Sequence, residues 1–237
     1  MNSNTSSSSK SNADAPIEAM AFPELVEPLD EAALQILEAA SKRFLHYGYN
    51  KTTMSEIAKD CNMSTGNLYR FFPSKLDIAE GFVKILRTEQ MSKLRLALHE
   101  PNLTAAERLR NFFKTKLSLT YNRFHDRPKA YELSTVILRE RKHFAVEWAD
   151  AEARLMGEII SMGIDEGVFP EGDTFEQAHL IQNAFYRFTM PTLFLDGEFE
   201  DLAVELDALI SLILDGLAVR ARGGDSAQTK MRVVEAP

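Results

Sequence analysis

Two Glu-x-x-His pairs are the residues of this sequence whose spacing could hold metal ions. Glu140 and His143 form the first pair, and Glu176 and His179 form the second. In di-iron helical bundles, two such pairs project inward together with two further Glu residues. The first pair, however, lies at an expected helix end among three Lys and Arg residues, which repel a cation. The sequence therefore predicts no metal site and no cofactor, and a helical metal-binding (di-iron-like) enzyme that uses these pairs stays the alternative.

Other kinds of catalytic chemistry find less support in the residues. The single cysteine, Cys61, has no histidine close to it in sequence. A nucleophile elbow and a phosphate-cradling glycine loop are both missing from the sequence. We therefore expect that the protein is not an enzyme.

A short helix opened by a capping box is expected near the start of the folded part. Apolar residues at three- and four-residue spacing predict a preceding helix over residues 30–46, which Gly48 ends. Thr53 and Glu56 then have the spacing of a capping box, in which each side chain accepts a backbone N–H of the other residue. A second helix is expected from there through residue 59.

A tight turn and a third helix follow at once. Residues 60–62 predict a turn, in which Asn62 tolerates a left-handed conformation. Ser64 can cap a helix over residues 65–72, which Pro73 ends because the residue before a proline avoids the helical region. Two short helices joined by such a turn are the outline of a helix-turn-helix.

The net charge is divided unevenly along the chain. The whole sequence carries a formal charge of −8, which argues against a nucleic-acid partner. Residues 41–75, however, hold six Lys and Arg residues against two acidic ones, hence +4, and the rest of the chain carries −12. A local basic surface on an acidic body is typical of a module that contacts phosphates.

Residues 36–76 resemble the DNA-binding segment of TetR-type transcriptional regulators. The residues that carry the resemblance follow in order and at the family's spacing: Ile36, Leu37, Ala39, Ala40, Phe44, Gly48, Thr52, Thr53, Met54, Ile57, Ala58, Met63, Ser64, Gly66, Leu68, Tyr69, Phe72, Ser74 and Lys75. Asn62 stands where the family often has Gly. The resemblance implies an all-α fold with an N-terminal three-helix helix-turn-helix DNA-binding domain joined to a larger helical ligand-binding and dimerisation domain.

The resemblance also implies that the third helix enters the major groove of double-stranded DNA. The base-reading residues would be Thr65, Gly66, Asn67, Tyr69 and Arg70. Asn67 can pair with adenine and Arg70 with guanine, each contributing ~1–3 kcal/mol of discrimination. The phosphate contacts would come from Thr53, Ser64 and Lys75, at or near helix N-termini with exposed N–H groups. The sequence does not separate repression from activation, which depends on operator position.

The rest of the chain is expected to be helical, to bind a small effector and to form a homodimer. The expected helices cover residues 75–99, 104–122, 128–140, 145–166, 173–190 and 199–220. The expected dimer residues, on the last two helices, are Ile181, Phe185, Phe188, Leu206, Ile210, Ile213 and Leu217. The expected pocket residues, for a small and largely apolar effector, are Phe113, Tyr121, Tyr131, Trp148 and Phe185.

Composition places this domain pair between two polar tails. We expect a flexible tail over residues 1–28, the DNA-binding domain over 29–75, the effector and dimer domain over 76–221, and a second flexible tail over 222–237. A Ser-rich start without an apolar stretch is not a secretory signal, and one cysteine cannot close an internal disulfide. Since no apolar run is long enough to span a bilayer, we expect a cytoplasmic protein without a membrane partner.

Overall fold

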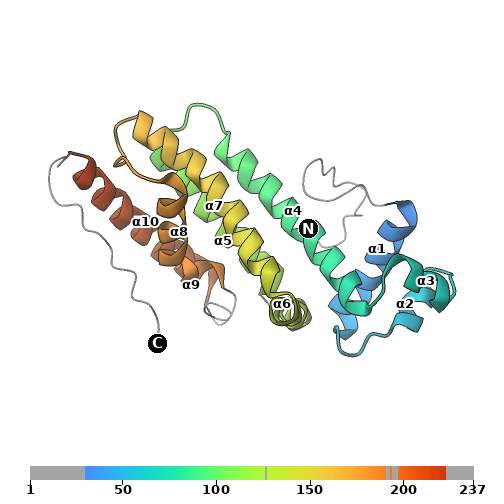
Figure 1. Cartoon of the computed structure of the whole chain (residues 1–237). Coiled ribbons are helices and arrows are strands. Elements are labelled where there is room, and N and C mark those ends of the chain that lie inside the picture. Colours follow the sequence, from blue (N-terminus) through green and yellow to red (C-terminus); the bar gives the residue numbers. More distant parts are fainter. Residues whose placement is uncertain (1–29, 126, 191–192, 194–196, 223–237) are drawn as a thin grey trace, which may run out of the picture. The chain divides into compact units, whose positions relative to one another are not determined.

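The computed structural model describes residues 30–125, 127–190, 193 and 197–222, of which 217–222 are described by their backbone alone. The described helices are α1 (Glu31–Tyr47), α2 (Met54–Asp60), α3 (Thr65–Phe71), α4 (Lys75–Leu98), α5 (Ala105–Phe124), α6 (Pro128–Glu140), α7 (Lys142–Asp165), α8 (Thr174–Ala184), α9 (Tyr186–Thr189) and α10 (Phe199–Arg222) (Figure 1). The prediction of an all-α fold is therefore confirmed. Apart from residue 222, the two expected tails lie outside the described residues.

The chain divides into two compact units, and the first is not continuous in sequence. Of the described residues, it contains 30–89 together with 132–137 of α6. The second contains the remaining described residues, from 90 onward. The domain boundary expected after Lys75 marks the end of the helix-turn-helix, whereas the first unit also includes the first half of α4.

The first unit is built around the apolar faces of α1, α2 and α3. Ile36, Phe44, Ile57 and Leu68 have no exposed surface, which shows that one face of each short helix is buried. Asp30 caps α1 by accepting the backbone N–H of Ala33 at 2.7 Å. Since each of the three helices has a side-chain cap, local sequence and burial specify the same arrangement.

The second unit packs α5 against both α7 and α10, and α8 against α7. Its core contains Phe112, Phe113, Met156 and Phe185, which are almost completely buried. Buried polar side chains also lie within this unit: Gln90, Lys116, Thr120 and Glu152. None of the described helices is long and apolar enough to cross a lipid bilayer.

The helix expected to run continuously from residue 173 to 190 is broken at Phe185, so that prediction is wrong. Phe185 lies at φ −95° and ψ 11°, outside regular helical values, and α9 begins at the next residue. The Phe185 ring is fully buried and stacks on Phe113, with ring centroids 3.9 Å apart. Tertiary packing of this ring accompanies the break, and helical periodicity has no signal for it.

Candidate nucleic-acid interface

The turn between α2 and α3 has the geometry that the sequence predicts. Cys61 ends α2, and Asn62 has φ 53°, in the left-handed region that Asn tolerates. The Met63 N–H then donates to the Ala58 carbonyl at 3.0 Å, which closes the turn. Asn62 thus takes the conformation that Gly provides at this position in similar sequences.

Helix α3 buries one face and exposes another. Ser64 caps it by accepting the Asn67 N–H at 3.1 Å, and Leu68 is completely buried. Tyr69 is 50% exposed and Arg70 is also exposed, so both side chains are accessible to a ligand on the outer face. Of the other predicted base-reading residues, Gly66 is exposed, and Thr65 and Asn67 are half-buried. The Gly66 position has only the Ser64 hydroxyl nearby, at 4.0 Å, so nothing obstructs a close approach there.

The N-terminus of α2 carries the predicted capping box. The Thr53 hydroxyl accepts the Glu56 N–H at 3.3 Å, and a Glu56 carboxylate oxygen accepts the Thr53 N–H at 2.9 Å. The same carboxylate accepts the Thr53 hydroxyl proton at 2.7 Å. These hydrogen bonds lower the pKa of Glu56, chiefly the one from the Thr53 side chain. A DNA phosphate at this helix end would therefore compete with an ionised Glu56 for the Thr53 hydroxyl.

Part of the basic charge in this unit is already paired. Arg43 of α1 donates from Nη2 to Asp60 at 3.1 Å, and its Nη1 lies 3.4 Å from Glu56. The hydrogen bond to Asp60 raises the pKa of Arg43 and lowers that of Asp60. Lys42 pairs with Glu38, one turn earlier on α1, at 2.7 Å. Arg43 thus ties α1 to α2, which is a role that the charge count alone does not reveal.

The ammonium group of Lys75 holds the loop between α1 and α2. Its Nζ donates to the carbonyl oxygens of Tyr49 and Thr52, both at 2.7 Å, and stands 4.2 Å from the centre of the Tyr49 ring. Partial burial lowers the Lys75 pKa. An ammonium group carries three N–H bonds, and these contacts use two of them. The predicted phosphate contact can therefore use only the remaining bond.

A residue of α6 also holds the loop between α1 and α2. The Asn50 N–H donates to a Glu132 carboxylate oxygen at 3.1 Å, although the two residues are 82 positions apart. Glu132 belongs to the part of α6 that lies in the first unit. Sequence reasoning missed this contact, because no local pattern links residues so far apart.

Two family descriptions match the chain in the order of its units. "Bacterial regulatory proteins, tetR family" matches residues 36–81, and "Tetracyclin repressor-like, C-terminal domain" matches residues 105–210. The chain belongs to the TetR family. The resemblance in the helix-turn-helix is thereby confirmed and extends through most of the second unit. TetR-family proteins are transcriptional regulators and not enzymes, so the expectation of a non-enzymatic protein is confirmed as well.

Individual relatives support the same assignment. The HTH-type transcriptional regulator YhgD of Bacillus subtilis is 40% identical over 68 residues, 29% of this chain and 35% of that protein. The alignment thus spans about a third of the length of that relative. The fatty acid metabolism regulator protein of B. subtilis is 23% identical over 188 residues, which are 78% of this chain and 94% of that protein. A transcriptional regulator from Cytophaga hutchinsonii has the same fold, with a TM-score of 0.62 and 24% identity over 80% of this chain and 100% of that one.

In this TetR-family protein, four of the five residues expected to line an effector pocket lie in or against the same core of the second unit. Phe113 and Phe185 stack in the core, while Tyr121 stacks on His125 with ring centroids 4.3 Å apart. Trp148 is half-buried and meets Phe144 edge-on. Tyr131 is half-buried as well.

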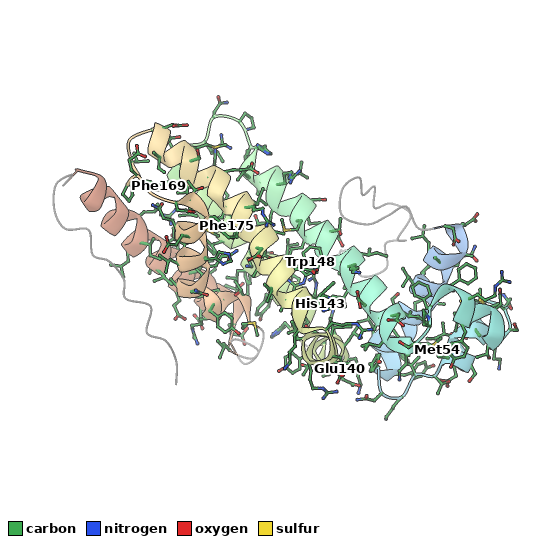
Figure 2. All side chains as sticks on the ribbon, viewed as in Figure 1. Met54, Glu140, His143, Trp148, Phe169 and Phe175 are labelled. Atoms are coloured by element: carbon green, nitrogen blue, oxygen red, sulfur yellow. The ribbon has the colours of Figure 1, made fainter. Side chains whose placement is uncertain are left out.

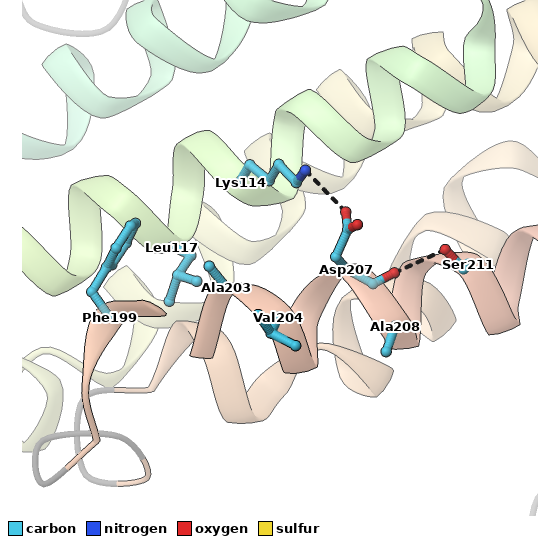
Figure 3. A pocket seen from close by; sticks show the side chains of 8 residues that line it. All are labelled: Lys114, Leu117, Phe199, Ala203, Val204, Asp207, Ala208 and Ser211. Carbon is cyan, nitrogen blue, oxygen red and sulfur yellow. Dashed lines mark hydrogen bonds and ion pairs between the residues drawn. The ribbon is translucent and has the colours of Figure 1, made fainter. Parts of the chain in front are cut away.

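A groove of about 600 Å³ lies between α5 and α10 (Figure 3). It is lined by Lys114, Leu117, Phe199, Ala203, Val204, Asp207, Ala208 and Ser211. Lys114 Nζ lies 3.0 Å from Asp207, whose pKa is lowered by hydrogen bonds from Lys114 and Arg110. None of the predicted pocket residues lines this groove.

Most residues expected at a dimer interface are interior to the chain itself. Five of them are at least 90% buried within the second unit: Ile181, Phe185, Phe188, Leu206 and Ile210. Ile213 is half-buried against the same core, and the side chain of Leu217 lies outside the described residues. The exposed apolar residues of α8 and α10 are different ones: Leu180 is 48%, Leu212 69% and Val204 72% exposed. The periodic stripe therefore faces the core of its own chain, and the predicted interface stays a prediction.

The Glu-x-x-His alternative fails on helix boundaries. α6 ends at Glu140 and α7 begins at Lys142, so Glu140 and His143 lie on successive helices (Figure 2). Glu140 pairs with Arg139 at 2.8 Å, and His179 lies 3.2 Å from Asp150. Among the described residues, no three His, Cys, Asp or Glu side chains gather as a metal site would require. The di-iron geometry needs each pair on one helix, and the first pair lacks it.

Proposed function

We propose that this TetR-family protein is a repressor that binds a palindromic operator in double-stranded DNA as a homodimer and leaves it when a small, largely apolar effector binds. The outer face of α3 carries the proposal. It presents Tyr69 and Arg70 to the outside while Leu68 fixes the helix from within. Since operators are segments of chromosomal DNA, we propose that the protein acts in the cytoplasm.

The proposed readout divides into base and phosphate contacts. The Asn67 amide accepts one hydrogen bond from adenine and donates another to it, and the Arg70 guanidinium donates hydrogen bonds to guanine. The rest of the proposed contact surface is formed by Thr65, Gly66 and Tyr69. Ser64 supports a phosphate contact, because its hydroxyl oxygen accepts the Asn67 N–H and its proton remains for donation. Thr53 and Lys75 are proposed as weaker phosphate contacts, since Glu56 and two carbonyl oxygens already engage them.

The proposed dimer uses the exposed stripe of α10 together with α8. Val204, Ala208 and Leu212 follow at four-residue intervals, so they lie on one side of α10. Leu180 and Ala184 have the same spacing on α8 and are both exposed. Two such helices from each copy form a four-helix bundle with an apolar centre. Dimerisation would place two α3 helices in successive major grooves, about 34–36 Å apart or a multiple of this.

The proposed effector is an acyl compound with a long hydrocarbon chain. The interior of the second unit supports this proposal, because aromatic and aliphatic side chains such as Phe113, Met156 and Phe185 dominate it. A relative that aligns with 78% of this chain is named a fatty acid metabolism regulator protein. Transfer of a hydrocarbon chain from water into such an interior is favourable, because it removes apolar surface from water.

Selection of bound fragments from a random DNA library tests the DNA-binding part of the proposal. We expect a palindromic site and a complex that weakens steeply with salt. Lack of binding even at low salt would overturn it. Transcription from a promoter overlapping the selected site should fall when the protein is added and recover with an acyl effector. A rise on protein addition would instead identify an activator.

A further inference from the structure

A network of polar side chains lies inside the second unit, where apolar packing would be expected. Lys116 of α5 donates from Nζ to Glu152 Oε2 of α7, and Gln90 Nε2 of α4 donates to Glu152 Oε1 at 3.1 Å. Arg123 donates to Gln90 Oε1 at 3.1 Å. Lys116, Glu152 and Gln90 are each more than 90% buried. Three helices thus meet around one buried ion pair.

Such a pair is weak evidence of a stabilising role. The free energy needed to remove two charges from water offsets much of the attraction between them. Apolar residues of the same volume therefore often give a protein that is as stable or more stable. A buried lysine and glutamate in the middle of a helical core therefore call for a reason other than stability.

The hydrogen bonds of Lys116 indicate that reason. An ammonium group carries three N–H bonds, and buried donors are normally satisfied. Within the described part of the chain, the Lys116 ammonium group has one acceptor, Glu152 Oε2. The Thr120 hydroxyl, one turn further on, donates to the Lys116 backbone carbonyl and not to the network. The Lys116 ammonium group can thus still donate to an acceptor from a ligand.

Apolar side chains lie directly beside this polar layer. Within the second unit, α5 runs opposite to residues 90–98 of α4, whereas α7 runs in the same direction as these residues (Figure 1). One turn from the polar layer, in the same direction along each helix, lie Leu94 on α4, Phe113 on α5 and Met156 on α7, all buried. The interior therefore offers a polar group at one level and hydrocarbon contacts at the next, which matches an amphiphilic molecule.

We infer that the Lys116 ammonium group, positioned by Glu152, is the polar recognition point of the effector site and binds an acyl oxygen of the ligand. This inference rests on the proposed function, whose effector it makes more specific. The hydrocarbon chain of the ligand lies between the side chains of the neighbouring apolar layer. The shared chemistry is a hydrogen-bond acceptor at the end of a hydrocarbon chain, either a free carboxylate or a thioester carbonyl.

The only tryptophan of the chain provides the readout. Trp148 lies one turn before Glu152 on α7 and is partly buried against the core. Its fluorescence is therefore expected to change when a ligand reaches Lys116. Palmitic acid and palmitoyl-coenzyme A, titrated separately into the full chain, distinguish the carboxylate from the thioester.

The test variant removes both charges and keeps the shapes of the side chains, as Lys116→Met with Glu152→Gln. The matched control removes a more exposed ion pair, which joins α5 to α10, as Lys114→Met with Asp207→Asn. We expect the test variant to bind the acyl probe about ten-fold more weakly or worse, because a hydrogen bond to a charged group is lost. DNA binding without ligand should stay as in the wild type, and the control should keep wild-type affinity for the probe.

A second measurement needs no variant and so does not depend on folding. Hexadecylamine has 16 carbon atoms like palmitic acid, but its cationic end cannot accept the Lys116 N–H. Glu152, which could attract this cation, is already engaged by Lys116 and Gln90. We expect the wild type to bind it at least about ten-fold more weakly than palmitic acid.

The outcomes separate the two proposals. Equal binding of the acyl probe by wild type and test variant, or equal binding of amine and acid, overturns the role of Lys116 and leaves the acyl effector standing. A wild type that binds neither acyl probe overturns the acyl effector and, with it, this inference. Failure to bind DNA, measured separately, overturns the repressor proposal alone.

Discussion

Replacing Lys75 with Met tests how the start of α4 holds the DNA-binding unit together. The substitution removes two hydrogen bonds of 2.7 Å to the Tyr49 and Thr52 carbonyl oxygens and the contact with the Tyr49 ring. A hydrogen bond to a charged group contributes ~1.5–3 kcal/mol, and we take about half of this because the side chain is partly exposed. The expected loss is roughly 2 kcal/mol in the free energy of unfolding, or a fall in Tm of ~4–8 °C.

The assay combines thermal unfolding with operator binding at several salt concentrations. Lys42→Met is the matched control, because the Lys42 ammonium group pairs with Glu38 on an exposed surface and should change stability by less than about 1 kcal/mol. A loss of stability together with weaker binding to all DNA sequences indicates that Lys75 positions the loop. If Lys75 also contacts a phosphate, the plot of log affinity against log salt concentration should become less steep by about 0.9 in the variant. Unchanged Tm and unchanged DNA affinity would refute the reasoning.

Four further variants address other parts of the molecule. Arg70→Ala should cost ~1–3 kcal/mol in operator affinity and relax the preference at one base pair, whereas an equal loss on all sequences would argue against base reading. Val204→Asp with Leu212→Asp should convert the proposed dimer to a monomer in sedimentation, because two exposed apolar residues of the proposed interface become charged; an unchanged mass would move the interface elsewhere. Glu107→Gln should lower Tm near neutral pH, since hydrogen bonds from Thr104 lower the Glu107 pKa; this contribution is lost as the pH falls through the lowered value, so the difference in Tm from wild type should close in acid. Gly163→Ala should destabilise the second unit by ~1–3 kcal/mol in denaturant unfolding, because an added Cβ would lie 2.0 Å from the Phe169 ring; an unchanged midpoint would show that the ring moves freely.

The helix-turn-helix is predictable from the sequence because its signals are local. Thr53 and Glu56 are three residues apart, and the structure has both hydrogen bonds of the capping box. Asn62 takes the left-handed conformation that its side chain permits. Ser64 and Pro73 mark the two ends of α3 correctly. Such elements depend on neighbouring residues alone, so one sequence is enough to find them.

The features that sequence reasoning missed depend on distant residues. The two carbonyl oxygens that Lys75 binds lie 26 and 23 positions before it. The apolar stripe containing Leu206 and Ile210 shows that α10 has a buried face, but periodicity does not say whether that face meets its own core or another copy. In the structure, Leu206 and Ile210 are buried in the core of their own chain, whereas Val204 is exposed. The pairing of Lys116 with Glu152 likewise joins two helices that no spacing rule connects.

The discontinuity of the first unit limits how this regulator can be taken apart. A fragment that ends at residue 89 would lack residues 132–137, which belong to the same compact unit, and the Asn50 N–H would lose its bond to Glu132. A chimera that joins this DNA-reading head to a different sensor must therefore carry that stretch of α6 as well. The DNA-reading head is compact in space but discontinuous in sequence. Exchange of sensors between regulators therefore needs three junctions in the gene, where a continuous head would need one.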